Sequence, residues 1–382
     1  MTPPRYVVFS GSLGKGNAGD EELLAAFLRR HGRAYGGAAA LVGGDRPRAA
    51  HPPPAVADWP LPLMAVGRRR WRGALARRRT RRELVRAAQG ALLDYVLLGG
   101  LFGVEAHVRS RLREIEWAAG FAERVRFYFG DAYLDPAAGA PAPSLAAVAR
   151  TLDRISAWIA VRSPAGAELL RSVGLRGPVH VGVDPVLHDR LRDGLPPRRP
   201  GSSFDLCVMN VCRNEADRWR PIWLGSAAAA ARAGAAVRWV PTSVPNDASL
   251  SEDLMAALAR EVPGARQELW TAADAAAGFA DADAAVTTRL HGTIFSVTAG
   301  TPTLVCGYGA KLERLCDDLG LRDWLVTPAH RDRPDAVEAA VARFRRLREP
   351  GAWAWDADRL GARLAQHDAA LAALDRELSD RS

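Results

Sequence analysis

The strongest constraint on the fold is a regular alternation of short apolar runs with segments of helical pattern. Runs with the composition of buried strands lie at 6–9, 39–42, 95–98, 125–129, 158–161, 179–181, 206–209, 237–240, 284–286 and 303–305. Helical patterns lie between them at 21–30, 110–121, 145–155, 165–173, 223–232, 250–260, 293–299, 311–319 and 336–347. Strands that alternate with helices form parallel sheets covered by helices on both faces. The sequence therefore predicts an α/β, doubly wound fold.

The alternation occurs twice. A polar, proline-rich stretch at 191–201 interrupts it, and a length of 382 residues is long for one domain. We expect an N-terminal acceptor-side α/β domain over 1–190 and a C-terminal donor-binding α/β domain over 202–356. A last helix, 357–382, is expected to pack back on both domains. Two Rossmann-like domains facing a cleft are thus predicted.

The stretch Arg289-Leu290-His291-Gly292 follows one of the predicted strands and opens a predicted helix. In open α/β sheets, ligands bind at the carboxyl ends of strands, and a helix N-terminus favours an anion. Arginine can hold a phosphate or carboxylate through two hydrogen bonds, and histidine can move a proton near neutral pH. Taken alone, this stretch fits an anion site and a structural arginine with a core histidine equally well.

A glycine-rich loop follows the first strand. It contains Gly11, Gly14, Gly16 and Gly19 within nine residues, and it ends in Asp20. Its spacing matches neither the dinucleotide fingerprint nor the Walker A loop. Asp20 is interpreted as the N-cap of the following helix in preference to a base for a substrate hydroxyl.

Together the two stretches resemble the polysaccharide pyruvyltransferase family. The resemblance rests on Asn17-Ala18-Gly19-Asp20, on Arg289-Leu290-His291, and on the turn Gly300-Thr301-Pro302, and it extends from Tyr6 to Leu321. The sequence departs from the family pattern at 98–105, at 129–133 and at 162–164, all in the first half. These departures concern the acceptor more than the donor.

The resemblance implies a glycosyltransferase-B-like fold and transfer of a pyruvyl group from phosphoenolpyruvate to two hydroxyls of a sugar. His291 is then the general acid/base, and Arg289 holds the donor anion. Further donor-binding residues would be Arg213, Gly292, Thr293 and Lys311, with backbone amides of Gly292 and Thr293 on the phosphate. Acceptor-binding residues would be Asn17, Asp20, Glu105 and His107.

The formal net charge is +9, and nine arginines lie between Arg68 and Arg82. This segment could meet an anionic membrane surface or a lipid-linked acceptor, or it could be a solvated helix face; of the two we favour the solvated face. Nucleic acid is not expected as a partner, because no recognition module accompanies the charge.

No apolar run reaches about 18 residues, and the chain passes directly into its first strand without a signal peptide. We therefore expect a cytoplasmic protein with peripheral membrane contact at most. The four cysteines have neither metal nor disulfide spacing. No metal and no cofactor are expected, with phosphoenolpyruvate as a co-substrate.

Two alternatives stay open. The first is a glycosyltransferase of the same fold that uses a nucleotide-sugar donor, for which Glu313 and Asp317 are the available acidic residues. The second is a family member that binds a glycan without turning it over.

Overall fold

The computed structural model describes residues 4–10, 13, 17–43, 64–66, 74–99, 105–130, 143–192, 204–270, 275–349 and 351–379. The chain forms two compact units. Unit 1 consists of Met1–Lys15, Asp20–His188 and Arg363–Ser382, and unit 2 consists of Gly16–Gly19 and Asp189–Ala362.

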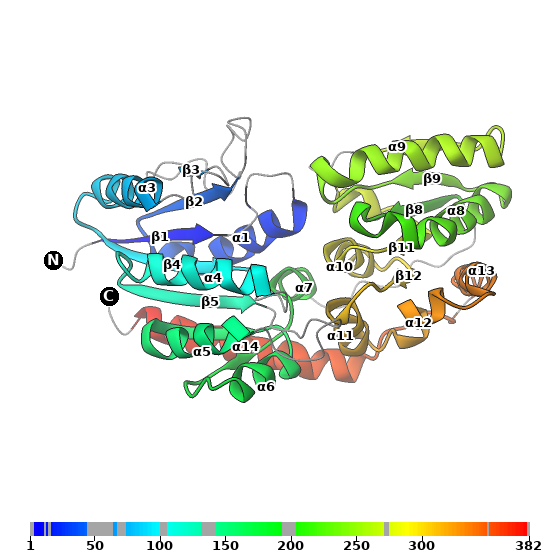
Figure 1. Ribbon diagram of the computed structural model, residues 1–382. Helices are drawn as coiled ribbons and strands as arrows, with labels where there is room; N and C mark the ends of the chain where they lie inside the picture. Colours follow the sequence, from blue (N-terminus) through cyan, green and yellow to red (C-terminus); the bar gives the residue numbers. More distant parts are fainter. Residues whose placement is uncertain are drawn as a thin grey trace. The chain divides into compact units, whose positions relative to one another are not determined.

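Unit 1 is built on a seven-stranded sheet of order β3-β2-β1-β4-β5-β6-β7, in which neighbouring strands are parallel (Figure 1). Its strands are β1 (Arg5–Ser10), β2 (Gly37–Gly43), β3 (Met64–Val66), β4 (Leu92–Leu98), β5 (Arg124–Gly130), β6 (Ser156–Val161) and β7 (His180–Val181). Its helices are most of α1 (Ala18–His31), α3 (Ala74–Ala87), α4 (Glu105–Ala118), α5 (Pro143–Ile155), α6 (Pro164–Ser172), the first part of α7 (Pro185–Leu191) and most of α14 (Ala357–Ser379).

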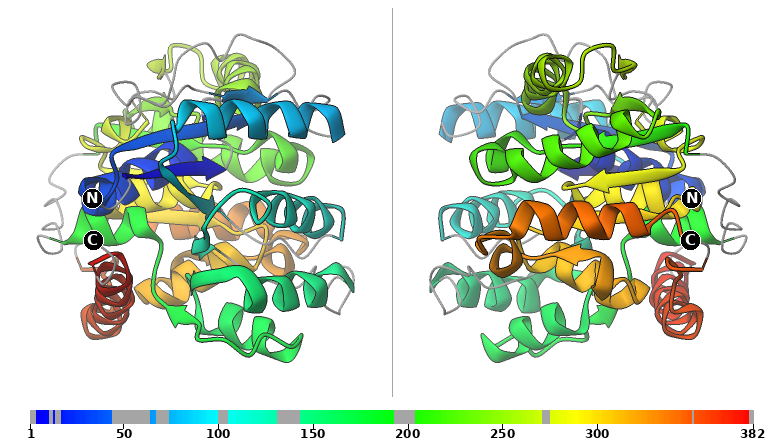
Figure 2. Two further views of the ribbon diagram at one scale, coloured as in Figure 1. Left: turned by 90° about the vertical axis from the view of Figure 1, so that its left-hand side faces the viewer. Right: turned by 90° about the vertical axis from the view of Figure 1, so that its right-hand side faces the viewer.

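Both faces of this sheet are covered by helices because its strands are apolar on both sides. On one face, Val8 and Tyr95 pack with buried residues of α3, α4, α5 and α6, such as Leu84 and Ile115. On the other face, strand residues including Val7 pack with residues of α1 and α14. The left view of Figure 2 shows α3, α4 and α5 along one face of the sheet. This is the layering of a doubly wound domain.

Unit 2 contains a six-stranded parallel sheet of order β10-β9-β8-β11-β12-β13. Its strands are β8 (Leu206–Asn210), β9 (Ala236–Trp239), β10 (Gln267–Leu269), β11 (Ala284–Thr287), β12 (Thr303–Cys306) and β13 (Leu325–Val326). Its helices are α8 (Ala216–Arg232), α9 (Val244–Glu261), α10 (Leu290–Thr298), α11 (Ala310–Leu319), α12 (Pro328–Arg331) and α13 (Ala336–Arg346), and a short 3₁₀ helix, η3 (Arg213–Glu215), follows β8.

The predicted fold class is confirmed, and each predicted strand corresponds to a strand of the structure. The sequence did not reveal β3, β10 and β13, which are two or three residues long and lie at or next to sheet edges. The prediction that Asp20 is an N-cap is wrong, because α1 begins at Ala18 and Asp20 lies inside its first turn. Most of the predicted linker at 191–201 lies outside the described residues.

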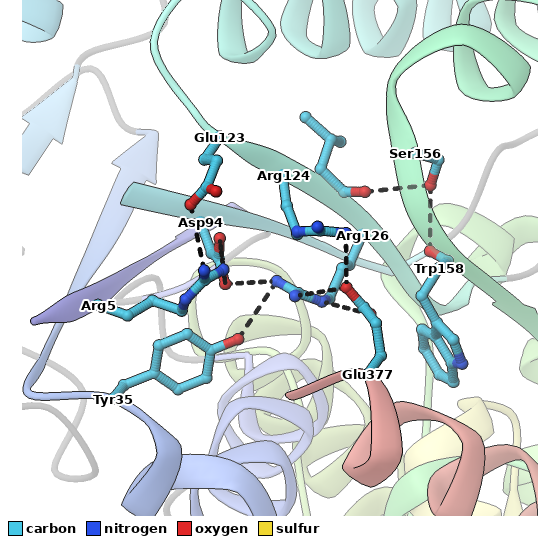
Figure 3. Close-up of polar contacts among 10 residues, drawn as sticks. Arg5, Tyr35, Asp94, Glu123, Arg124, Arg126, Ser156, Trp158 and Glu377 are labelled. Atoms are coloured by element: carbon cyan, nitrogen blue, oxygen red, sulfur yellow. Dashed lines mark hydrogen bonds and ion pairs between the residues drawn. The ribbon is translucent and has the colours of Figure 1, made fainter. Parts of the chain in front are cut away.

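A buried charge network joins α14 to the sheet of unit 1 (Figure 3). The guanidinium of Arg126 lies 2.6 Å from the carboxylate of Asp94 and 3.1 Å from that of Glu377, which is on α14. Arg5 adds a second ion pair to Asp94 at 2.9 Å. The side chain of Asp94 is 0% exposed and that of Arg126 is 1% exposed, so water cannot replace either partner. The network therefore holds the end of α14 against β4 and β5.

Replacing Asp94 by Asn should destabilise unit 1 strongly, because it removes the nearer and fully buried one of the two carboxylates that pair with the guanidinium of Arg126. Removing one partner of a buried ion pair typically costs about 3–5 kcal/mol of unfolding free energy. Urea unfolding followed by circular dichroism measures the change. Asp335→Asn, in the exposed pair with Arg333, is the control and should leave the unfolding midpoint nearly unchanged. Equal midpoints for the two variants would contradict this role of Asp94.

Acid should destabilise unit 1 through His31, a buried residue at the end of α1. Burial lowers the pKa of His31 from 6.5 to about 4, and the nearby Arg30 and Arg126 act in the same direction while Asp375 opposes them. Between these two pH values the unfolded chain binds a proton that the folded chain does not. The unfolding free energy therefore falls as the pH drops through this range.

His31→Phe keeps an aromatic ring beside Phe27, whose ring centroid is 5.0 Å from that of His31, and removes the titrating group. We expect this variant to lose less stability than the wild type between pH 7 and pH 4.5, as measured by urea unfolding at both pH values. Identical losses would show that His31 does not carry the effect.

Candidate functional site

The candidate site lies at the carboxyl-terminal edge of the unit 2 sheet. Chain order reverses between the neighbouring strands β8 and β11, and such a reversal is where open α/β sheets bind ligands. Arg213 follows β8, and Arg289 follows β11. The loops after β9 and β12 reach the same edge, because parallel strands all end on one side.

Buried polar contacts fix the backbone at Arg289. The side chain of Asn210, at the end of β8, is 0% exposed. Its Oδ1 accepts a hydrogen bond from the amide of Arg289 at 3.2 Å, and its Nδ2 donates to the carbonyl of Val240 at 2.7 Å. The indole of Trp223 donates to Oγ1 of Thr288 at 2.9 Å. The start of α10 is thus held between β8, β9 and α8.

Gly292 allows this close approach. A Cβ atom on Gly292 would lie 2.0 Å from Oδ1 of Asn210, which is much shorter than any normal non-bonded contact. Glycine is therefore required at this position by packing, which is a sufficient reason for its presence in the Arg-Leu-His-Gly stretch. Binding of a donor phosphate by its amide stays a prediction.

The guanidinium of Arg289 is bound by Asp247, a residue of α9. Nε of Arg289 donates to Oδ2 of Asp247 at 3.0 Å, and Nη2 donates to Oδ1 at 2.6 Å. Burial disfavours the charged guanidinium, but the hydrogen bonds and negative charge of Asp247 outweigh this, so the pKa of Arg289 is raised. The side chain of Arg289 is 20% exposed, whereas that of Asp247 is 0% exposed. Arg289 can therefore contact a ligand while Asp247 supports it from behind.

Arg213 is tied to the same carboxylate. Its backbone amide donates to Oδ1 of Asp247 at 3.1 Å, and its Nη1 donates to Oγ of Ser249 at 2.7 Å. The structure thus joins Arg213 and Arg289, both predicted to bind the donor, through Asp247. Asp247 itself was not predicted from the sequence. The sequence feature that could have identified Asp247 is its position shortly after the predicted strand at 237–240, which ends at the same edge of the sheet.

His291 and Thr293 lie in the first half of α10. His291 is half-buried and comes two residues after the N-cap Arg289. Thr293 is fully buried, its amide donates to the carbonyl of Arg289 at 2.9 Å, and its Oγ1 lies 2.8 Å from Oγ1 of Thr287. The expectation that the amide of Thr293 binds phosphate is therefore corrected, because the helix already uses that amide.

Lys311 occupies the first turn of α11, after the loop that follows β12. Its Nζ lies 4.9 Å from the centre of the Tyr308 ring, a cation–π contact that restrains the side chain. α10 follows β11 and α11 follows β12, and these two strands are neighbours in the sheet, so the N-termini of the two helices lie at the same edge. Two helix N-termini, each carrying a cation, favour an anionic ligand.

The predicted acceptor residues are divided between the two units, with Asn17 in unit 2 and the other three in unit 1. Asn17 forms an isolated bridge with Ser243 and is part of unit 2. Asp20 lies in the first turn of α1, and His107 is exposed on α4. Glu105 accepts hydrogen bonds from the amide and hydroxyl of Ser144 and from Arg109, which lower its pKa to about 2. Glu105 thus joins α4 to α5, and its role toward an acceptor stays a prediction.

A second buried polar cluster, missed from the sequence, lies at the corresponding edge of unit 1. Glu114 of α4 accepts a hydrogen bond from Ser10, the last residue of β1, and another from the hydroxyl of Tyr95. Arg111 pairs with the other carboxylate oxygen at 2.9 Å. The cluster supports the point where the glycine-rich loop leaves β1.

The arginine-rich segment is described from α3 onward, and Arg68 to Arg72 lie outside the described residues. Arg78, Arg79, Arg81 and Arg82 are exposed, whereas Thr80 and Leu84 are buried. This part is a surface helix with a basic outer face, as both hypotheses require. Contact with a membrane or an anionic acceptor stays a hypothesis.

The described part of the chain contains neither a cluster of metal ligands nor a helix that could span a membrane. No three histidine, cysteine, aspartate or glutamate side chains gather there as metal ligands. No helix in those ranges is long and apolar enough to cross a membrane. All four cysteines are buried and free, and burial raises the pKa of Cys306 to about 12.

The family model for polysaccharide pyruvyl transferase matches residues 51–309. One similar solved structure is Anabaena HepE in complex with UDP and glucose, with 13% sequence identity, a TM-score of 0.58, and coverage of 98% of this chain and 99% of that chain. A second is the UDP-GlcNAc 2-epimerase of Methanocaldococcus jannaschii, with 10% identity, a TM-score of 0.58, and coverage of 97% of this chain and 99% of that chain. A third is an alpha-glucosyltransferase in complex with UDP and DNA, with 9% identity, a TM-score of 0.51, and coverage of 99% of this chain and 100% of that chain. These likenesses show the two-domain GT-B fold. No curated protein sequence matches the chain significantly.

Gly292→Ala should destabilise unit 2, because its Cβ would overlap Asn210 and push α10 away from β8. Overpacking of this kind typically costs about 1–3 kcal/mol of unfolding free energy. Gly309→Ala is the matched control. Gly309 is the N-cap of α11 at the same edge of the sheet, and a Cβ atom there would have no other atom within 4 Å. Thermal unfolding should separate the two variants. If Gly292→Ala is as stable as the control, the close approach to Asn210 is not a constraint.

Proposed function

Because the chain belongs to the polysaccharide pyruvyl transferase family, we propose that it transfers a pyruvyl group from phosphoenolpyruvate to a sugar. The sugar acceptor would be part of a glycan, a lipid-linked glycan or a glycosylated metabolite. The product would be a cyclic pyruvate ketal across two hydroxyls, with inorganic phosphate as the leaving group.

The observation that carries the proposal is the pair of cations at neighbouring helix N-termini in unit 2. Arg289 is the N-cap of α10, and Lys311 lies in the first turn of α11. Phosphoenolpyruvate carries a phosphate and a carboxylate, so its binding requires positive charge and N–H donors around both groups. Helix N-termini supply such donors, and arginine supplies paired hydrogen bonds to an oxyanion.

His291 is the proposed general acid/base. The reaction begins when a proton is added to the methylene carbon of the donor, which makes the adjacent carbon electrophilic. The first sugar hydroxyl adds to that carbon and loses its proton. The bond from that carbon to the phosphate oxygen then breaks, and inorganic phosphate leaves. The second hydroxyl adds to the same carbon, loses its proton and closes the ketal. An imidazole suits both proton donation and proton removal near neutral pH.

Transfer from a nucleotide sugar is the second candidate, since two of the similar structures contain UDP. Such a donor requires an acidic side chain for the ribose hydroxyls. Asp317 is held by Arg322 at 2.7 Å, and Glu313 lies in the first turn of α11 beside Lys311. Phosphate release from phosphoenolpyruvate supports the first candidate, and UDP release from a UDP-sugar supports the second. A protein that binds acceptor glycans and releases neither product would be a non-catalytic member.

We expect His291→Gln to lower kcat for phosphate release by about 10²–10⁴-fold, the usual contribution of a general acid/base. Binding of phosphoenolpyruvate, measured by calorimetry, should remain, because the cations are unchanged. Thr298→Ala, in the last turn of the same helix, is the control and should retain its kcat. A His291→Gln variant with wild-type kcat would remove His291 from the chemistry.

A further inference from the structure

The two arginines assigned to the donor share one buried carboxylate. Asp247 accepts N–H groups from the side chain of Arg289 and from the backbone of Arg213. Its side chain is 0% exposed, so a ligand cannot reach it directly. Asp247 therefore acts on a bound anion without contacting it, through its negative charge and through the groups that it holds.

The contact fixes the orientation of Arg289. A guanidinium is planar, and Asp247 binds the edge formed by Nε and Nη2 at 3.0 and 2.6 Å. Two parallel hydrogen bonds fix the plane as well as the position of the group. The remaining terminal nitrogen, Nη1, is then directed away from Asp247, and the side chain is exposed by 20%. Nη1 is the atom that this geometry presents to a ligand.

The contact also offsets charge. Asp247 and Arg289 together are formally neutral, so Arg289 acts toward an anion as a directed hydrogen-bond donor more than as a net positive charge. Net positive charge at this edge comes from Arg213, from Lys311 and from the N-termini of α10 and α11. An anion held in this way is oriented but bound less tightly than by an uncompensated arginine.

We propose that Asp247 is the positioning residue of the donor site, which orients Nη1 of Arg289 and weakens its hold on the phosphate that must leave. The proposal rests on the proposed function for its substrate, but its first test does not. Inorganic phosphate binding measures the hold on the anion whether or not the protein turns over phosphoenolpyruvate.

Asp247→Asn removes the compensating charge and should tighten the binding of inorganic phosphate at least tenfold, because a unit charge within about 10 Å has at least this effect at an effective dielectric constant near 20. Asp253→Asn is the matched control, because it makes the same charge change on an exposed position of the same helix. Its phosphate affinity should equal that of the wild type. Calorimetric titration with phosphate at constant ionic strength gives both values.

Asp247→Glu separates orientation from charge. It keeps the negative charge but moves the carboxylate by one methylene group, so phosphate affinity should stay near wild type. With phosphoenolpyruvate and an acceptor, kcat should fall at least tenfold while the donor KM changes little. Arg289→Lys keeps the positive charge but cannot form two hydrogen bonds to Asp247. It should likewise lower kcat with little change in the donor KM.

Three results would overturn the proposal. The first is equal phosphate affinity of Asp247→Asn and Asp253→Asn. The second is a kcat loss in the double variant Arg289→Lys/Asp247→Glu that equals the product of the two single losses, since residues acting through each other are not additive. The third, if both Asp247 variants fail to fold, is an unchanged kcat in Arg289→Lys. If no variant and no wild-type protein releases phosphate while the affinities shift as expected, the proposed substrate fails and the role of Asp247 stands.

Discussion

Parallel pairing of the strands is the constraint on which the unit 2 site depends. In a parallel sheet every strand ends on the same edge, so the segments after β9, β8, β11 and β12 meet although they are far apart in sequence. Asn210 converts this general arrangement into a fixed one. Its buried side chain bridges the loop after β9 and the backbone of Arg289, and Gly292 lets α10 approach it. That contact adds a side-chain constraint on the N-cap of α10 to the backbone pairing of β8 and β11.

Buried carboxylates hold arginines in both units, with different consequences. In unit 1, Asp94 and Glu377 enclose Arg126, whose side chain is 1% exposed, and the pair serves to attach α14. In unit 2, Asp247 is equally buried but its partner Arg289 remains 20% exposed. Burying an ion pair rarely gains stability over an apolar pair of similar size. A partly exposed arginine at the edge where open α/β sheets bind ligands therefore favours a functional role for the pair at Asp247. The network at Asp94, in contrast, is fully accounted for by attachment of α14.

Sequence reasoning found what periodicity and chain order determine. The apolar runs gave the longer strands of both sheets, and the position of Arg289 after such a run placed it at a strand end. It failed where the deciding contact joins residues distant in sequence. Asp247 reaches Arg289 across 42 positions, and Glu114 reaches Ser10 across 104, and neither distance leaves a local pattern. The start of α1 was misjudged for a related reason. Asp20 has the chemistry of an N-cap, but the helix extends back to Ala18.

The same fold can serve donors of different chemistry, because the sheet fixes only where the strand ends are. What distinguishes a small anionic donor from a nucleotide sugar is the set of side chains presented at the starts of α10 and α11. Here these starts carry Arg289 and Lys311, with the charge of Arg289 compensated by Asp247. A small donor with two anionic groups gains most from closely spaced N–H donors and cations, whereas a nucleotide also needs an apolar surface for its base and an acceptor for its ribose. The arrangement at the edge of unit 2 supplies closely spaced N–H donors and cations, and this supports the small anionic donor that we propose.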